Sequence, residues 1–297
     1  MANYTYEESV RWLRRQPEHA ELVEASYLDE DNLAAARRFA VSEEFEAVAG
    51  LLGLKHGARL DILDLGCGNG IASYAFAALG HRVTALDPDP SADVGLAATA
   101  RLSPGLAGEI KTVSSFAESL PFADASYDVV YERQALHHFQ DLRGGLAECA
   151  RVLKPGGKLL ATREHVVNDE AQLAEFLAAH PLQPLHGGEH AYRLDEYLAA
   201  IDSTGLKVVR CFAPYDSVIN HFPESNDQVK WKVYEVLKGQ YGPVAPLLVR
   251  LRYFEEKYRR RLSSNCDIPG RLYSFLCVRE AGEGDRGRAR VRDSASG

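Results

Sequence analysis

Short apolar runs alternate with amphipathic stretches through the middle of the chain. Helical spacing of apolar residues predicts helices at about 71–79, 91–102 and 141–153. This alternation is typical of βαβ units, in which a parallel sheet is covered by helices on both faces. K-P-G-G at 154–157 is expected to form a turn that ends a helix and leads into a strand. The predicted strands of this part are 60–65, 82–87, 110–114, 127–132 and 158–164.

The flanking parts of the chain have a different pattern. Residues 1 to about 56 are helical by their spacing, and a helix at 194–203 precedes strands at 207–212 and 272–278. About 60 residues separate those two strands, which is too long for a loop inside an α/β domain. They contain two amphipathic stretches, at 226–240 and 244–262. We therefore expect an added helical element before the last strand.

The seven strand-like runs predict one doubly wound α/β domain with a mostly parallel, seven-stranded sheet. A helical N-terminal cap is expected at 1–56, and the α/β domain at 57–212. The helical insertion is expected at 213–268, where we predict that it covers the substrate. The last strand is expected at 269–279. Residues 280–297 have almost no apolar side chains, which predicts a disordered tail.

Composition narrows the class of protein. Of 297 residues, 46% are apolar and 26% charged, which is ordinary for a soluble globular protein. The formal net charge of -8 argues against a nucleic-acid binder with a basic surface, and no apolar run approaches the length of a membrane span. The N-terminus carries charges where a signal peptide needs an apolar core, and the five cysteines form no C-x-x-C pair. We expect a cytoplasmic protein with reduced thiols and no membrane partner.

The most informative motif is D-L-G-C-G-N-G, which runs from Asp64 to Gly70 between a strand and a helix. Gly66, Gly68 and Gly70 allow a tight turn and let backbone N–H groups approach a ligand, with Cys67 between them. The nicotinamide fingerprint is G-x-G-x-x-G, whereas this turn has an acid two residues before its first glycine. A carboxylate there repels a phosphate and attracts ammonium and sulfonium charges. The turn therefore predicts S-adenosyl-L-methionine, which has both charges and no phosphate.

Two further motifs support a nucleoside ligand. Asp87 ends the second strand and precedes Pro88, where a carboxylate can accept hydrogen bonds from both ribose hydroxyls. Nicotinamide enzymes use the same device, so Asp87 indicates a ribose and not which cofactor. It could also serve only as a helix cap or turn residue. The stretch F-A-E-S-L-P-F at 116–122 follows the third strand, close to the expected adenine site.

These motifs, together with Y-D-V-V-Y-E-R-Q-A-L-H-H-F and R-V-L-K-P-G-G-K-L-L, occur in the order seen in class I S-adenosylmethionine-dependent methyltransferases. From about residue 58 to 165 the chain resembles the type 11 methyltransferase domains of this class. The resemblance implies a Rossmann-like sheet and methyl transfer to a small-molecule substrate. It does not identify the acceptor molecule or the acceptor atom.

The resemblance also implies roles for individual residues. Many relatives have an aspartate that contacts adenine where this chain has Phe116, which could stack on the ring or enter the core. Glu118 could substitute for that acid, although the family glutamate at this place is commonly structural. The implied cofactor contacts are Asp64, Gly66 and Gly68 at the methionine and ribose end, Asp87 at the ribose hydroxyls, the backbone N–H of Ala117 at adenine, and Arg133 and Gln134 beside the methionine moiety.

Candidate catalytic residues follow two neighbouring strands. Methyl transfer needs alignment above all, and a base helps when the acceptor is a hydroxyl or a protonated amine. His137 and His138 follow the fourth predicted strand, and Glu164 and His165 end the fifth. Glu164 could orient His165, although successive side chains on a strand point in opposite directions. One histidine of L-H-H-F could instead pack or orient its loop.

The stretch H-P-L-Q-P-L-H-G-G-E-H-A-Y at 180–192 raises the question of a metal. Its H-x-x-E-H spacing needs a helix to bring the ligands to one face, and Gly187-Gly188 disfavours a helix. We expect no metal site, and either a loop on the substrate side or a plain surface loop.

Two other regions have candidate roles. Arg38, in the N-terminal helices, could meet the methionine carboxylate of the cofactor, or it could belong to a solvated helix face like its neighbour Arg37. The insertion at 213–268 is the expected determinant of substrate choice. Its helix at 231–237 could pack on the sheet or form a homodimer contact.

Two other functions remain open at this stage. A class I fold can bind S-adenosylmethionine and use it for other chemistry such as cyclisation, and a catalytically silent partner can keep the cofactor turn.

Overall fold

The computed structural model describes residues 4–54 and 57–280. Its central sheet has the strand order β3-β2-β1-β4-β5-β8-β7, in which only β8 runs antiparallel to its neighbours. A two-residue strand, β6 (Tyr192–Arg193), pairs with the end of β5. The main strands are β1 (Asp61–Leu65), β2 (Arg82–Leu86), β3 (Glu109–Val113), β4 (Tyr127–Arg133), β5 (Leu153–Val167), β7 (Leu206–Phe212) and β8 (Arg271–Arg279). The predicted doubly wound, mostly parallel α/β fold is confirmed, with one short strand added.

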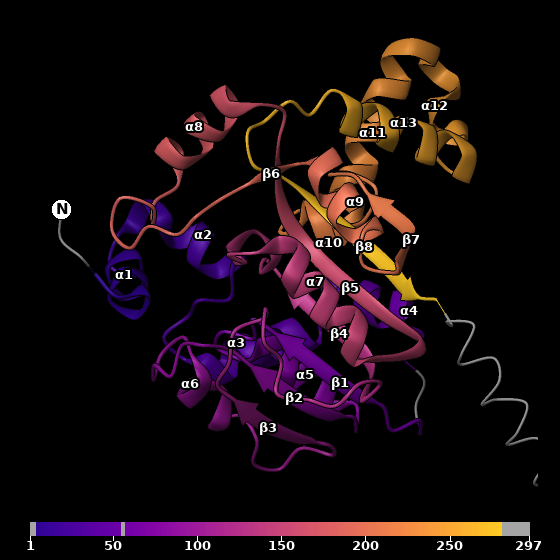
Figure 1. Ribbon diagram of the computed structural model, residues 1–297. Helices are drawn as coiled ribbons and strands as arrows, with labels where there is room; N and C mark the ends of the chain where they lie inside the picture. Colours follow the sequence, from indigo (N-terminus) through magenta and orange to yellow (C-terminus); the bar gives the residue numbers. More distant parts are fainter. Residues whose placement is uncertain (1–3, 55–56, 281–297) are drawn as a thin grey trace, which may run out of the picture.

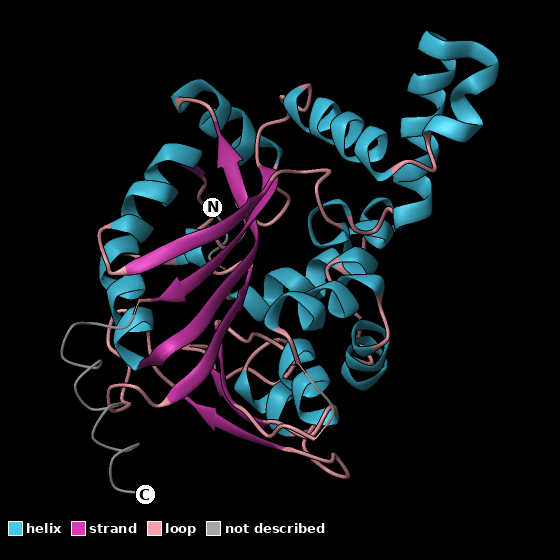
Figure 2. Ribbon diagram, turned by 90° about the vertical axis from the view of Figure 1, so that its right-hand side faces the viewer, coloured by secondary structure: helices cyan, strands magenta, loops and turns pink. Residues whose placement is uncertain are grey.

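Helices cover both faces of this sheet (Figure 2). Successive side chains of a buried strand enter opposite layers of the fold, because neighbouring residues of a strand point to opposite faces of the sheet. Ile62 of β1 packs in the layer that contains Phe39, Phe45 and Phe76, and its neighbour Leu63 packs in the opposite layer. The first layer holds α3 (Asn32–Ala40), α4 (Glu43–Leu52) and α5 (Ile71–Ala78), and the second holds α7 (Leu142–Val152) and α9 (Leu194–Asp202).

The N-terminal segment is helical, with α1 (Tyr6–Leu13), η1 (Pro17–His19) and α2 (Ala20–Ala25) before α3 and α4. Thr5 and Glu8 form a capping box at the start of α1, and the Ser42 hydroxyl accepts the N–H of Phe45 at the start of α4. Val10 and Leu13 of α1 pack against Val94 and Leu182. Helix α1 therefore rests on the loop after β2 and on the loop after α8 (Glu170–Ala179).

The predicted helical insertion lies between β7 and β8 and extends away from the sheet (Figure 1). Its longest helices are α11 (Asn226–Tyr241) and α13 (Arg252–Ser264), joined through η3 (Gly242–Val244) and α12 (Ala245–Leu248), and preceded by α10 (Val218–His221). Val233, Leu237, Ala245 and Tyr258 form a core within the insertion. Its amphipathic helices thus bury much of their apolar surface against one another.

Several local predictions differ from the structure. The helix expected at 91–102 is reduced to α6 (Leu96–Ala100), because Gly95 lies against the backbone of Asp89 in a tight turn. β5 already begins at Leu153, and K-P-G-G is a bulge within it, where the register to β4 shifts. Helix α8 (Glu170–Ala179) was not predicted.

The predicted disordered tail at 280–297 lies, apart from Glu280, outside the described residues. Among residues 4–54 and 57–280, no helix is long and apolar enough to cross a membrane.

Candidate active site

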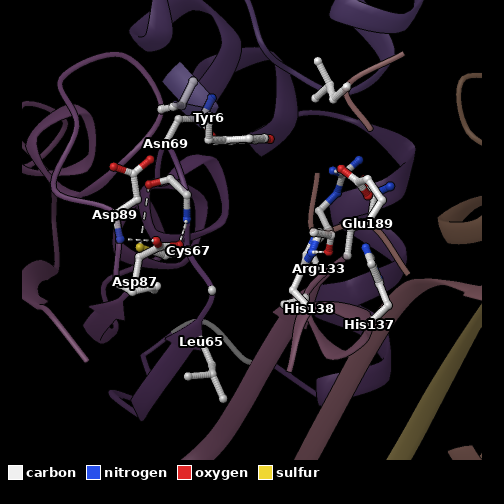
Figure 3. A pocket seen from close by; sticks show the side chains of 18 of the residues that line it. Tyr6, Leu65, Cys67, Asn69, Asp87, Asp89, Arg133, His137, His138 and Glu189 are labelled. Carbon is white, nitrogen blue, oxygen red and sulfur yellow. Dashed lines mark hydrogen bonds between the residues drawn. The ribbon is translucent and has the colours of Figure 1, made fainter. Parts of the chain in front are cut away.

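A cavity of about 490 Å³ opens at the carboxyl ends of the parallel strands, a size typical of small-molecule sites. Figure 3 shows two facing groups of side chains. One group, around Cys67, Asn69 and Asp87, comes from the glycine turn and the end of β2. The other includes His137, His138 and Glu189.

The glycine turn is tied to β2, because the N–H groups of Gly66 and Cys67 both donate to the Leu86 carbonyl at 2.8 and 3.0 Å. Gly66 has a φ of 67°, and a Cβ there would stand 2.8 Å from the Cβ of Ala135. Only glycine satisfies both conditions without strain. Gly66, Cys67 and Gly68 all line the cavity.

Gly70, which the sequence predicts as a cofactor contact, does not lie on the lining of this cavity. It is the N-cap of α5 with a φ of 80°, and a Cβ there would approach the Thr99 side chain to 2.6 Å. Its missing side chain therefore allows α5 to pack closely against α6.

Asp64 lies at the base of the glycine turn and is only 2% exposed. Its carboxylate accepts the Ser73 hydroxyl at 2.5 Å. Burial raises the pKa of Asp64 from 3.8 to about 7, and the nearby Asp87 charge adds to this rise. A cation in the cavity would favour the ionised form.

Asp87 projects from the end of β2 toward the glycine turn, next to the exposed Pro88. Its two carboxylate oxygens accept the N–H groups of Gly68 at 2.9 Å and Asp89 at 2.8 Å. Burial raises its pKa. Each oxygen keeps a free lone pair for a further donor, as ribose hydroxyls would supply.

The expected adenine side is formed by Phe116 and Ala117, which both line the cavity. Phe116 is 58% exposed and therefore does not enter the core, so of the two predicted alternatives only stacking remains open for it. The Glu118 carboxylate accepts the N–H groups of Gln140 and Asp141, so its contacts fix the loop after β4.

Arg133 and Gln134 also lie on the cavity lining, at the end of β4. The Arg133 guanidinium makes a bidentate ion pair with the fully buried Glu44, at 2.8 and 3.2 Å. Gln134 has a φ of 55°, a strained conformation that often marks functional sites. The Arg133 side chain is thus held by α4 at the edge of the cavity.

Arg38, which the sequence offers as a contact of the methionine carboxylate, does not lie on the lining of this cavity. Its guanidinium makes two hydrogen bonds to the Asp29 carboxylate, at 3.1 and 2.7 Å, and one to the Glu24 carbonyl. It therefore joins α3 to the segment after α2. Its neighbour Arg37 is exposed.

Glu164 is 0% exposed and does not line the cavity, but it fixes a residue that does. Its carboxylate accepts the N–H groups of Ala135 and His137 at 3.1 and 3.2 Å and contacts Nδ1 of His137 at 2.8 Å. The predicted partner was His165, whose Nδ1 instead lies 2.8 Å from the Gly270 carbonyl. The alternation of side chains along β5 explains this correction.

Three of the histidines on the cavity lining, His137, His138 and His165, differ in their surroundings. His137 is buried, and burial lowers its pKa well below 6.5. Burial also lowers the pKa of His165, to about 3. The exposed His138 turns its Nδ1 to the Gly188 carbonyl at 3.1 Å. His137 and His138 belong to the short turn η2 (Leu136–His138), which places their rings 4.2 Å apart.

Further residues line the cavity, some of them in the loop at 180–192, for which a loop on the substrate side was one of two predicted alternatives. Tyr6 of α1 and Asn69 of the glycine turn lie on its lining, and Asn69 donates to the Tyr27 carbonyl at 2.8 Å. His180 and Glu189 bring the loop after α8 into the site. A histidine-rich loop signalled this last contribution, whereas a single tyrosine near the N-terminus gave no signal.

The helical insertion at 213–268 contributes no residue to the cavity, whose described lining residues all fall between Tyr6 and Glu189. The prediction that this insertion covers the substrate therefore finds no support in this cavity. The N-terminal helices and the loop at 180–189 occupy that place.

Comparisons with known proteins agree with this geometry. Residues 63–161 match the family model described as a methyltransferase domain. The ubiquinone biosynthesis O-methyltransferase of Rhizobium leguminosarum bv. trifolii is 30% identical over 153 residues, which are 50% of this chain and 60% of that protein. Among solved structures, the YcgJ protein of Bacillus subtilis has a TM-score of 0.52 at 20% identity and covers 80% of this chain and 99% of its own. The [4+2]-cyclase SpnF has a TM-score of 0.53 at 20% identity, with coverages of 86% and 85%.

Residues 63–161 thus form a methyltransferase domain of the class I, S-adenosylmethionine-dependent type, as their motifs predicted, and the cofactor of this class is S-adenosylmethionine. The Rhizobium relative named above is an O-methyltransferase of ubiquinone biosynthesis, and the match spans 60% of its length.

Proposed function

We propose that this protein transfers the methyl group of S-adenosylmethionine to a hydroxyl oxygen of a small molecule. One observation carries the proposal: a single cavity joins the glycine turn and Asp87 to the wall formed by His137, His138 and His165. The name of the relative from Rhizobium supports oxygen as the acceptor atom.

The cofactor would lie along the first group of residues. Asp87 would accept the ribose hydroxyls, Phe116 and Ala117 would contact the adenine, and Gly66 and Gly68 would contact the methionine part. Asp64 would balance the positive charge of the cofactor. The histidine wall would then face the methyl group, where the acceptor must lie for in-line displacement.

The transfer itself needs few catalytic groups. The acceptor oxygen forms a bond to the methyl carbon while the carbon–sulfur bond breaks, and sulfur keeps the electron pair and becomes neutral. The hydroxyl proton must leave during this step, and ionising the hydroxyl accelerates it. His137 and His165, which burial keeps neutral, supply lone pairs on this wall, which can accept a hydrogen bond from the hydroxyl or hold an ion.

The test is an assay with S-adenosylmethionine labelled in its methyl group and a panel of phenols, catechols, amines and thiols. We expect label in O-methylated products and formation of S-adenosylhomocysteine. Label only in N- or S-methylated products would contradict the oxygen acceptor. Cofactor binding with no labelled product from any acceptor class would favour a silent partner or other chemistry.

Cofactor affinity is expected to rise about five- to tenfold from pH 5.5 to pH 7. The pKa of Asp64 is raised to about 7, so the free protein holds this group neutral below that pH and the bound cation favours its ionised form. The gain therefore appears as pH rises toward 7. Isothermal titration calorimetry at several pH values measures it.

Asp64→Asn serves as the control, because it keeps the shape of the side chain and cannot ionise. In this variant the increase of cofactor affinity with pH should largely vanish. At pH 7 the variant should bind S-adenosylmethionine more weakly than the unaltered protein does. An unchanged slope would assign the pH dependence to another group.

Glu164→Gln is expected to lower kcat by about tenfold and to leave the affinity for S-adenosylhomocysteine unchanged. The variant keeps the shape of the side chain and loses the charge that fixes His137, an effect typical of such supporting contacts. Steady-state kinetics with calorimetry separates the two quantities. Glu132→Gln is the matched control, since Glu132 is equally buried but contacts Cys149 and does not line the cavity. Equal losses in both variants would indicate a general effect of replacing a buried carboxyl group.

A further inference from the structure

Three side chains from distant parts of the chain converge on the histidine wall. One nitrogen of His137, one of His138 and a carboxylate oxygen of Glu189 all lie within 4.8 Å of one another. Figure 3 shows them side by side on the cavity. We propose that these three residues bind a divalent transition-metal ion, of the Zn²⁺ or Fe²⁺ type, with open coordination positions toward the acceptor.

The hydrogen bonds of both histidines direct one nitrogen of each ring to such an ion. Nδ1 of His138 must donate to the Gly188 carbonyl, because a carbonyl only accepts. Nδ1 of His137 donates to Glu164, whose carboxylate already accepts two backbone N–H groups. In both rings Nε2 therefore carries the lone pair.

The contact between Glu164 and His137 is itself typical of metal sites. Histidine ligands commonly donate their second N–H to a carboxylate or a backbone carbonyl, which fixes the ring and increases its basicity. His137 uses a carboxylate and His138 a carbonyl. The structure thus contains both kinds of supporting contact, one to a carboxylate and one to a carbonyl, without a bound ion.

Glu189 supplies an independent observation. Its side chain is only 8% exposed, and among the described residues its carboxylate accepts no hydrogen bond. The nearest cationic candidate, Nδ1 of His180, stands 3.6 Å away and is itself buried without a hydrogen-bond partner among the described residues. A buried carboxylate is costly unless it is paired or coordinates a metal. Burial accordingly raises the pKa of Glu189.

The donor set selects the kind of ion. Two imidazole nitrogens and one carboxylate oxygen suit Zn²⁺ and Fe²⁺, whereas Mg²⁺ and Ca²⁺ prefer oxygen ligands. Two ligands about 2.1 Å from a tetrahedral Zn²⁺ stand about 3.4 Å apart, so the three donors, which lie within 4.8 Å of one another, must close by somewhat more than about 1 Å.

This site differs from the one that the sequence suggested. The H-x-x-E-H spacing would join Glu189 to His186 and His190 on a helix, and the prediction of no metal was based on the glycines that prevent it. In the structure Glu189 instead meets the pair that follows β4. His190 packs its ring against Tyr192, and Nδ1 of His186 lies 3.1 Å from the Tyr4 carbonyl.

The ion's role rests on the proposed function. Bound to the acceptor hydroxyl, it would lower the pKa of that group and release its proton to solvent, leaving an oxygen anion in line with the methyl group. The ion is not consumed, and the methyl transfer needs no redox change.

The site is tested on the full chain, stripped with a chelator and titrated with Zn²⁺ by calorimetry and with Co²⁺ by absorption spectroscopy. We expect one equivalent to bind, with Co²⁺ bands typical of nitrogen and oxygen ligands. His138→Ala and Glu189→Gln should each weaken Zn²⁺ binding by at least about tenfold. His190→Ala, the adjacent histidine outside the cluster, should bind as the unaltered protein does. Absence of stoichiometric binding, or equal affinity in all variants, would mean an adventitious ion only and would overturn the proposal.

A methylation assay separates this proposal from the proposed function. If the stripped protein methylates its acceptor as fast as the Zn²⁺- or Fe²⁺-loaded protein, the metal's role in transfer is wrong and the methyltransferase stands. If the ion binds at the three residues but no acceptor is methylated, the proposed function fails and the metal site stands.

Discussion

Replacing Gly66 with alanine is expected to lower the affinity for S-adenosylmethionine by about a hundredfold or more. The new Cβ would stand 2.8 Å from the Cβ of Ala135, so the turn after β1 and the turn after β4 must move apart. Both turns line the cavity, and a displacement of about 1 Å at a binding site can cost about a hundredfold. Calorimetry with S-adenosylhomocysteine measures the loss directly.

Gly80→Ala is the matched control for this prediction. Gly80 also has a positive φ, of 94°, but a Cβ there meets no atom within 4 Å, and Gly80 does not line the cavity. Both variants should therefore lose about 1 to 2 kcal/mol of folding stability through backbone strain, and Gly66→Ala should lose more because of its close contact with Ala135. Only Gly66→Ala should lose cofactor affinity. Normal binding by a folded Gly66→Ala variant would mean that this turn does not hold the cofactor.

Asp87→Ala is expected to weaken cofactor binding by about 1 to 3 kcal/mol, which corresponds to about 5- to 150-fold in affinity. The carboxylate would lose its hydrogen bonds to the ribose hydroxyls. It would also release the Gly68 N–H, which it now holds at 2.9 Å, so the glycine turn becomes less ordered. Calorimetry with S-adenosylmethionine, at a pH where Asp64 is ionised, gives the change in binding free energy.

Asp89→Asn controls for the loss of one negative charge at the same edge of the cavity. Asp89 lies two residues away, and its carboxylate caps the N–H and hydroxyl of Ser91. Its replacement should change cofactor affinity by no more than about twofold. Equal effects of the two variants would reduce the role of Asp87 to general electrostatics, and unchanged affinity in Asp87→Ala would place the ribose elsewhere.

The sheet and the cofactor side could be predicted because their signals are local. The sequence shows one strand that leads into an acid and three glycines, and a second strand that ends in Asp87. Because the two strands are parallel and adjacent, the glycine turn and the Asp87 carboxylate must lie together. The direction of the side chains could be derived as well. Glu164 and His165 are neighbours on β5, and the structure turns them to different partners.

The other side of the cavity depends on contacts between distant segments, which a sequence pattern does not reveal. Glu189 reaches His137 and His138 from a loop some fifty residues further along the chain, held by backbone contacts such as that from Gly188 to His138. Tyr6 reaches the site because α1 packs on Val94 and Leu182. The helical insertion could be located from its length, but its apolar faces pair with one another and not with the substrate side.

The central claim is that one cavity seats the nucleoside of S-adenosylmethionine at Gly66 and Asp87 and directs its methyl group toward the histidine wall. A crystal structure of the complex with S-adenosylhomocysteine tests it most directly. The account predicts ribose hydroxyls at Asp87 and a sulfur atom that faces the side of His137 and His138. A nucleoside bound elsewhere, or a sulfur that faces away from these histidines, would contradict it.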